Sequence, residues 1–165
     1  MTAAHAVGSA QTSRTMMKLL VLLASAAALK QPRSKQIAVR GGGVDKAGVV
    51  KAVEVAWGFY AAQMILVPSK VQNDHFEEKA TKMTDFWARG HGVSIAAGIY
   101  MLTQLDTEVA FKAAMAWVAG IAVAYPYNAK FSLFAEYKQK YPMHYVPEVL
   151  MAALLGAGLV ANQAE

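Results

Sequence analysis

The sequence lacks cysteine altogether and contains few charged residues. Without a thiol, the chain can form no disulfide bond, thiolate nucleophile, zinc–thiolate site or iron–sulfur cluster. Charged residues make up 16% of the 165 residues and hydrophobic residues 56%, whereas soluble globular proteins carry about 25% charged residues. So little charge cannot coat a water-facing surface, and the composition therefore favours a membrane protein.

The sequence also lacks the common catalytic motifs. It has no GxSxG, GxGxxG or P-loop segment, and its histidines form no HxxxH or HxxHH cluster of the kind that holds two iron ions in membrane oxidases. We therefore expect no catalytic residue, no metal site and no enzymatic activity.

Basic residues are concentrated near the N-terminus. Residues 1–46 contain seven bases and one acid, whereas the remainder contains nine bases and ten acids. The net charge of +5 thus belongs to the N-terminal segment. The nearly neutral remainder offers no basic surface for nucleic acid.

This basic segment has the composition of a targeting leader. Lys18 precedes an unbroken apolar run at residues 19–29, which ends in small residues, as in a secretory signal peptide. Residues 30–44 are basic and free of acids, as in an organellar transit peptide. We predict a leader at residues 1–43, cleaved so that the mature N-terminus lies between residues 29 and 48. A signal anchor or an ordinary buried helix is the alternative for residues 19–29.

The two-part leader resembles the bipartite targeting sequences of algae with complex, red-lineage plastids. The Arg40-Gly41-Gly42-Gly43 stretch is also similar to a motif common near leader ends in such algae. This resemblance implies a plastid protein, with the thylakoid membrane as its location. A membrane of the secretory pathway is the alternative.

Four apolar segments follow the leader, at residues 48–67, 84–105, 109–125 and 147–161. Pro68 closes the first, Pro126 stops or kinks the third, and Pro147 opens the fourth. The first segment is followed by a polar loop. Soluble amphipathic helices would carry polar residues at every turn, and these segments do not. We predict an all-α fold over residues 44–165, an integral membrane bundle of about four transmembrane helices; a soluble helical bundle is the alternative.

Small residues recur every four positions within these segments, which would place them on one helix face. In a bilayer, such faces let helices approach closely. The predicted helix-packing residues are Gly90, Ser94 and Gly98, then Ala116, Gly120 and Ala124.

A few polar residues interrupt the apolar segments, and intramembrane polar residues are candidates for function. These are Glu54, Gln63 and Arg89. His91 lies between two glycines, which leave room for a flat macrocycle, and Trp87 precedes it by one turn. Because imidazole is a common axial ligand, we predict His91 as a chlorophyll ligand, with chlorophyll and carotenoid as the expected cofactors. A helix-end histidine bonded to a loop is the alternative.

The body resembles small DoxX-like four-helix membrane proteins. The shared features are the Val67-Pro68-Ser69-Lys70 step after the first helix and the Arg89-Gly90 step in a glycine-rich second helix. These families include subunits and accessory proteins of varied role, so the resemblance implies no active site.

Small size, packing faces and missing catalytic motifs together predict a non-catalytic structural or assembly subunit of a larger membrane complex. With the plastid leader, the expected host is a thylakoid photosystem–antenna assembly, whose core and antenna proteins would be partners along with membrane lipid. The alternative is a small transporter or channel-like protein that uses Glu54, Gln63 and Arg89 around a polar cavity.

Overall fold

A computed structural model of the protein describes residues 43–163. The predicted leader and most of the interval in which we expect its cleavage lie outside these residues, so both stay predictions. The predicted body at residues 44–165 falls within the described part except for the last two residues.

The described residues form helices and no β-strand, as the all-α prediction requires. A single bridge between Phe76 and Gln139 is the only strand-like pairing among them. The helices are α2 (Lys46–Leu66), α3 (Pro68–His75), α4 (Lys82–Leu102), α5 (Thr107–Ala124), α6 (Pro126–Phe131) and α7 (Tyr145–Gln163).

The helix ends follow local sequence signals. Side-chain oxygens cap three of the four long helices at their N-termini, where backbone N–H groups lack partners. Asp45 accepts from the N–H of Gly48 at 2.7 Å, Asp106 accepts from that of Val109, and Thr81 forms a capping box at the start of α4. Pro126 separates α5 from α6, as predicted.

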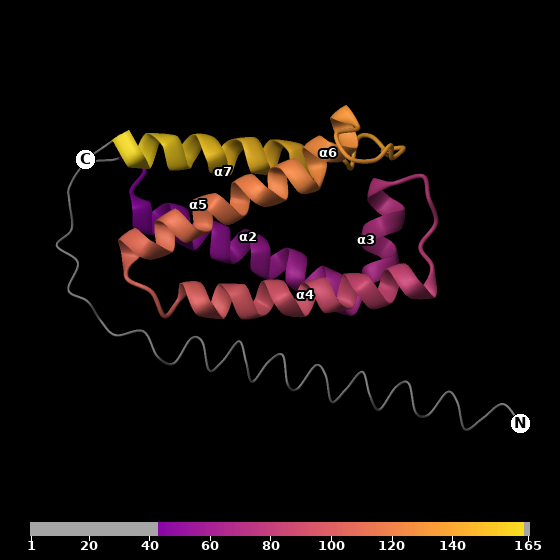
Figure 1. Cartoon of the computed structure of the whole chain (residues 1–165), viewed down its shortest axis with the longest axis horizontal. Helices are drawn as coiled ribbons and strands as arrows, with labels where there is room; N and C mark the ends of the chain where they lie inside the picture. Colours follow the sequence, from indigo (N-terminus) through magenta and orange to yellow (C-terminus); the bar gives the residue numbers. More distant parts are fainter. Residues whose placement is uncertain (1–42, 164–165) are drawn as a thin grey trace, which may run out of the picture. The chain divides into compact units, whose positions relative to one another are not determined.

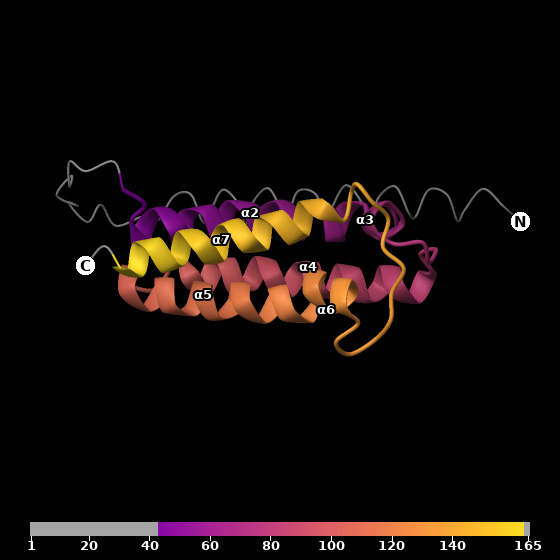
Figure 2. The same cartoon turned by 90° about the horizontal axis from the view of Figure 1, so that it is seen from above.

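Helix α2 is the centre of the bundle, because it packs against α4, α5 and α7 (Figures 1 and 2). Figure 1 shows α4 and α5 separating from one another with distance from the turn that joins them. The short helix α3 lies across the far end of the bundle, where α6 and the start of α7 also lie. The predicted loop after Pro68 therefore begins with a helix.

The bundle is held together by narrow faces of buried apolar side chains on the four long helices. These buried faces repeat every three or four residues, as expected for helix packing. They comprise Val49, Val53, Trp57 and Ala61 of α2, Ile95 and Leu102 of α4, Ala110, Ala114, Val118 and Ala122 of α5, and Met151, Leu154 and Ala161 of α7.

Three of the described helical stretches are long and apolar enough to cross a membrane, namely Lys46–Leu66, Thr107–Phe131 and Tyr145–Gln163. Only about a third of each lies buried inside the bundle. Helix α4 does not qualify, since Lys82, Asp85 and Arg89 occupy its first half. The structure thus supports a helical membrane protein with three candidate spans, and the predicted fourth span is not confirmed.

Candidate functional site

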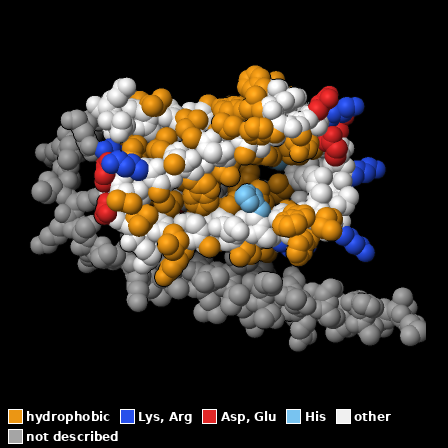
Figure 3. Space-filling view, in the orientation of Figure 1, with side chains coloured by type: hydrophobic (Ala, Val, Ile, Leu, Met, Phe, Trp, Pro, Cys, Tyr) orange, Lys and Arg blue, Asp and Glu red, His pale blue; other side chains and the backbone are white. Residues whose placement is uncertain are grey.

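A small apolar cavity lies among the four long helices, on the side where α4 and α5 separate. Its volume is about 130 Å³. Figure 3 shows hydrophobic side chains gathered in the hollow on this face of the bundle. The lining residues are Trp57, Tyr60 and Met64 of α2, His91 and Ile95 of α4, Ile121 and Tyr125 at α5, and Pro147 and Met151 of α7.

Four of the lining side chains carry a polar atom. The indole Nε1 of Trp57 is buried and has no hydrogen-bond partner within the described chain. The hydroxyl groups of Tyr60 and Tyr125 and the ring of His91 likewise make no hydrogen bond to a described residue. A buried N–H group without an acceptor is rare in folded proteins, but the Trp57 Nε1 atom is enclosed by protein and exposes almost no surface, so the cavity walls are essentially apolar.

His91 faces the cavity rather than the segment that follows Pro68. His91 is also exposed, so the cavity reaches the surface of the bundle at His91. A cavity of about 150 Å³ holds one benzene ring, and a tetrapyrrole is far larger. A chlorophyll ligated by His91 would therefore keep its macrocycle outside the cavity, against the outer side of α4. Chlorophyll ligation stays a prediction.

The other predicted intramembrane polar residues do not converge. Glu54 pairs with Lys51 one turn earlier, with the Nζ and Oε2 atoms 3.0 Å apart. Gln63 is half-buried and Arg89 is exposed. None of Glu54, Gln63 and Arg89 lines the cavity, so the described chain does not assemble them into the polar cavity that a transporter would need.

The predicted small-residue faces meet different surroundings. Gly98 approaches α5 so closely that a Cβ atom there would lie 2.6 Å from Cη2 of Trp117. Gly90 and Ser94 are exposed, and the Ser94 hydroxyl donates to the Gly90 carbonyl of its own helix. On α5 the whole predicted face points away from the bundle, with Ala116, Gly120 and Ala124 all exposed.

Glycines outside the predicted faces make close contacts as well. A Cβ atom on Gly92 would lie 2.8 Å from Cγ1 of Ile65 and 3.0 Å from the carbonyl oxygen of Ala61. Gly158 of α7 is packed against Met115 of α5. The spacing of small residues revealed that such contacts exist, but not which glycines make them.

Two buried histidines lie at the end of the bundle next to the cavity. His144 is fully buried and His75 is 7% exposed, with ring centroids 6.0 Å apart. Phe76, Tyr125 and Tyr141 surround the His144 ring at centroid distances of 5.2–6.1 Å. The sequence places both histidines in polar segments between apolar ones, which carries no signal that they become buried.

Burial disfavours the charged form of both imidazoles. It lowers the pKa of His144 below the ordinary value of 6.5, against the opposing charge of Glu148 and the nearby carbonyl groups of Pro126 and His75. Burial also lowers the pKa of His75, helped by His144 and opposed by Asp74. Neither nitrogen of His144 meets a partner at hydrogen-bond geometry in the described chain.

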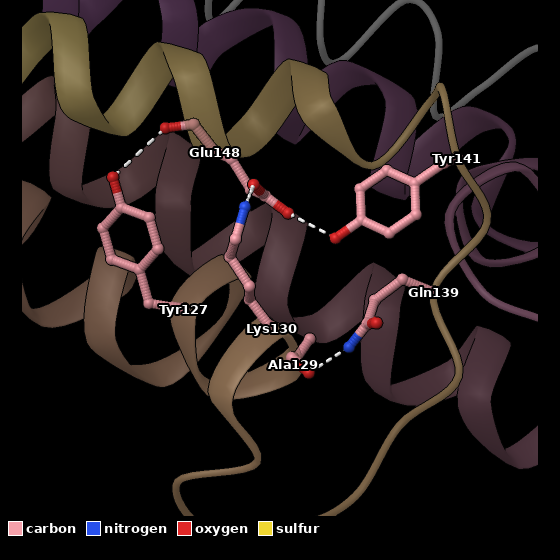
Figure 4. Close-up of polar contacts among 6 residues, drawn as sticks. All are labelled: Tyr127, Ala129, Lys130, Gln139, Tyr141 and Glu148. Carbon is pink, nitrogen blue, oxygen red and sulfur yellow. Dashed lines mark hydrogen bonds and ion pairs between the residues drawn. The ribbon is translucent and has the colours of Figure 1, made fainter.

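A polar cluster centred on Glu148 ties α6 to α7 (Figure 4). The buried Glu148 carboxylate pairs with Lys130 and accepts from the Tyr141 hydroxyl at 2.9 Å. The Tyr127 hydroxyl donates to the backbone carbonyl of Glu148 at 3.2 Å. The Gln139 side chain donates to the Ala129 carbonyl. Every member is paired, so the cluster has the character of a structural clamp rather than an open binding site.

Neither a metal centre nor a known relative identifies the site. Across residues 43–163, no group of three or more His, Asp or Glu side chains is placed to hold a metal ion. Comparisons with protein families, curated proteins and solved structures found no match to this chain.

Proposed function

We propose that this chain is a non-catalytic subunit of a larger membrane complex. The observation that carries the proposal is the outward face of its apolar helices. About two-thirds of each candidate span lies outside the interior of the bundle, and on α5 the exposed side presents Ala116, Gly120 and Ala124 in a row. Small residues at such spacing let a neighbouring helix approach closely in lipid.

The leader composition supports a thylakoid photosystem–antenna assembly as the host. In that setting, α4 would complete a four-span body by packing its polar first half against partner subunits or at the bilayer surface. His91 would meet chlorophyll on the outer side of α4, and carotenoid would lie along the apolar faces. These statements rest on the sequence pattern and on the exposure of His91.

Native electrophoresis of a tagged full-length chain tests this function. Mild detergent extracts of the source membrane should show the chain in a band much larger than 17.7 kDa, and for the photosystem host that band should carry chlorophyll. Migration of the wild-type chain as a small, separate species would contradict the subunit role. A large band without pigment would exclude the photosystem host but would leave the subunit role standing.

A pair of Gly→Leu variants tests the docking face. A Cβ atom at Gly120 meets nothing within 4 Å, so Gly120→Leu should leave the fold intact and release the chain from the large band. Gly156→Leu on α7 is the matched control, because Gly156 is equally open. Equal retention of both variants would show that the α5 face is not the contact.

A further inference from the structure

The first half of α4 exposes bases and large apolar side chains on one surface. Phe86 is 63% exposed and Trp87 67%, with Met83 beside them at 64%. Lys82 and Arg89 are also exposed, and their spacing of seven residues places both on the same side of the helix. We infer that this surface, the α4 patch, binds the head group of an anionic lipid. Such binding presupposes the membrane location of the proposed function but not membership of a complex.

Bases without a partner occur at only one end of the described bundle. At the end where α2 begins, Lys46 and Lys112 both pair with Glu108, and Lys51 pairs with Glu54. At the α3 end, four side chains form no ion pair or hydrogen bond within residues 43–163, namely those of Lys79, Lys82, Arg89 and Lys138. Two of these four bases belong to the α4 patch, which therefore offers positive charge to an external anion.

The nearby acids face away from the patch. Asp85 precedes Arg89 by one turn, but its Oδ2 accepts from the Ser69 hydroxyl of α3 at 2.6 Å and its Oδ1 is buried. The backbone N–H of Glu77 donates to the Lys138 carbonyl at 2.8 Å, which ties the acidic segment after α3 to the segment before α7. The patch thus complements a lipid with a net negative charge better than a zwitterionic lipid.

Its position along α4 places the patch at head-group depth. From Gly90 to Leu102 the helix contains no Lys, Arg, Asp or Glu over about 20 Å, a stretch suited to hydrocarbon. Figures 1 and 2 show α4 beginning beyond the ends of α2, α5 and α7, so these helices leave its first turns uncovered. Aromatic rings and long bases are typical of the membrane–water interface. An acidic protein would meet the two bases but would not account for the three apolar side chains beside them.

Lipid binding to the purified full-length chain in a neutral detergent tests the inference. Native mass spectrometry with dioleoylphosphatidylglycerol and dioleoylphosphatidylcholine compares two lipids that differ only in the head group. The wild-type chain should bind phosphatidylglycerol more tightly by about tenfold or more, since each base near an anionic lipid surface contributes about fivefold. Equal affinity for the two lipids would overturn the inference, whatever the size of the native band, and would favour an acidic protein as the occupant.

Two charge-matched double variants locate the lipid. Lys82→Gln with Arg89→Gln should abolish the preference for phosphatidylglycerol, each substitution lowering that affinity about fivefold. Lys51→Gln with Lys112→Gln removes the same charge at the opposite end of the bundle, from two exposed side chains, and should bind as wild type. A wild-type preference in the first variant would place the lipid at other bases, and an equal loss in both would reflect net charge alone. Either result would overturn the inference.

A spin label measures the depth of the patch. Because the chain has no cysteine, Met83→Cys and Ala97→Cys each provide a unique thiol at an exposed position of α4. In liposomes that contain phosphatidylglycerol, the ratio of collisions with oxygen to collisions with a polar nickel complex should be high at position 97. At position 83 it should lie between that value and the value for a free nitroxide in buffer. A ratio at position 83 equal to either limit would place the patch in water or in hydrocarbon and would overturn the inference.

Discussion

At the scale of single residues, helix packing depends on which glycines lie at the contacts between helices. Gly98 leaves room for the Trp117 ring, and that ring in turn stands edge to face against Trp57. A side chain on Gly98 would therefore displace two aromatic rings. Gly120 has no such neighbour, although the two glycines look alike in the sequence.

Gly98→Leu should destabilise the bundle by about 1–3 kcal/mol, the usual cost of overpacking, whereas Ile99→Leu should cost less than about 1.5 kcal/mol. Unfolding midpoints in mixed SDS and mild detergent measure the difference. Gly120→Leu is the control for the substitution itself, because its site is open. Equal midpoints for Gly98→Leu and Gly120→Leu would mean that Gly98 faces lipid.

The sequence predicts some of these residues and misses others for a definable reason. His91 could be found because a lone imidazole in an apolar segment is unusual. Trp57, Tyr60 and Tyr125 look like ordinary packing or interfacial aromatics, and only the packing of separate helices brings them to one cavity. Gly90 and Ser94 share the spacing of Gly98 but not its contact, because alanine-rich helices carry small residues on every face.

At the scale of elements, the segments between the long helices form a cap over the end of the bundle that holds the buried histidines. The N–H of Lys140 donates to the His75 carbonyl, and that of Glu77 to the Lys138 carbonyl, each at 2.8 Å. The Lys140 ammonium donates to the Asn73 carbonyl. These hydrogen bonds join the end of α3 to the segment before α7. His144 lies buried next to them.

Acid should weaken this cap. The unfolded chain binds a proton at each imidazole near pH 6.5, and the folded chain binds it only at lower pH. Acidification through this interval therefore favours unfolding. Thermal unfolding in detergent should occur at a lower temperature at pH 5.5 than at pH 8. His144→Phe should shrink that difference by removing one of the two groups. An unchanged pH dependence in His144→Phe would show that the His144 ring does not contribute to it.

Helix positions were largely predictable and their partners were not. The four predicted segments correspond to α2, α4, α5 and α7 within about three residues, since proline and capping side chains mark their ends. The cap escaped prediction because its segments lie far apart in the chain and its polar side chains look like solvated loops.

At the scale of the whole molecule, many large apolar side chains of the described bundle remain exposed. Exposed large hydrophobic side chains occur on every long helix, among them Phe59 of α2, Trp87 of α4, Val109 of α5 and Leu159 of α7. Soluble monomers rarely expose apolar patches wider than a few hundred Å². Lipid or partner helices must therefore cover what the chain itself does not.

Washing membranes with alkaline carbonate should leave this protein in the pellet. Three apolar helices, each with only about a third of its span buried inside the bundle, cannot move into water without a large hydrophobic cost. A peripheral membrane protein followed in the same wash provides the control for complete stripping. Recovery of the chain in the supernatant would contradict the membrane assignment and favour the alternative, a soluble helical bundle.

The close approach of Gly92 to α2 has a consequence for biogenesis. A segment with Lys82, Asp85 and Arg89 in its first half enters a bilayer poorly by itself, while α2 is apolar enough to enter alone. In a four-span topology, α4 would then be drawn in by α2, with Gly92 seated on the Ala61 carbonyl. A bulky residue at position 92 would therefore first affect membrane insertion of the nascent chain, and α4 would be left outside the membrane.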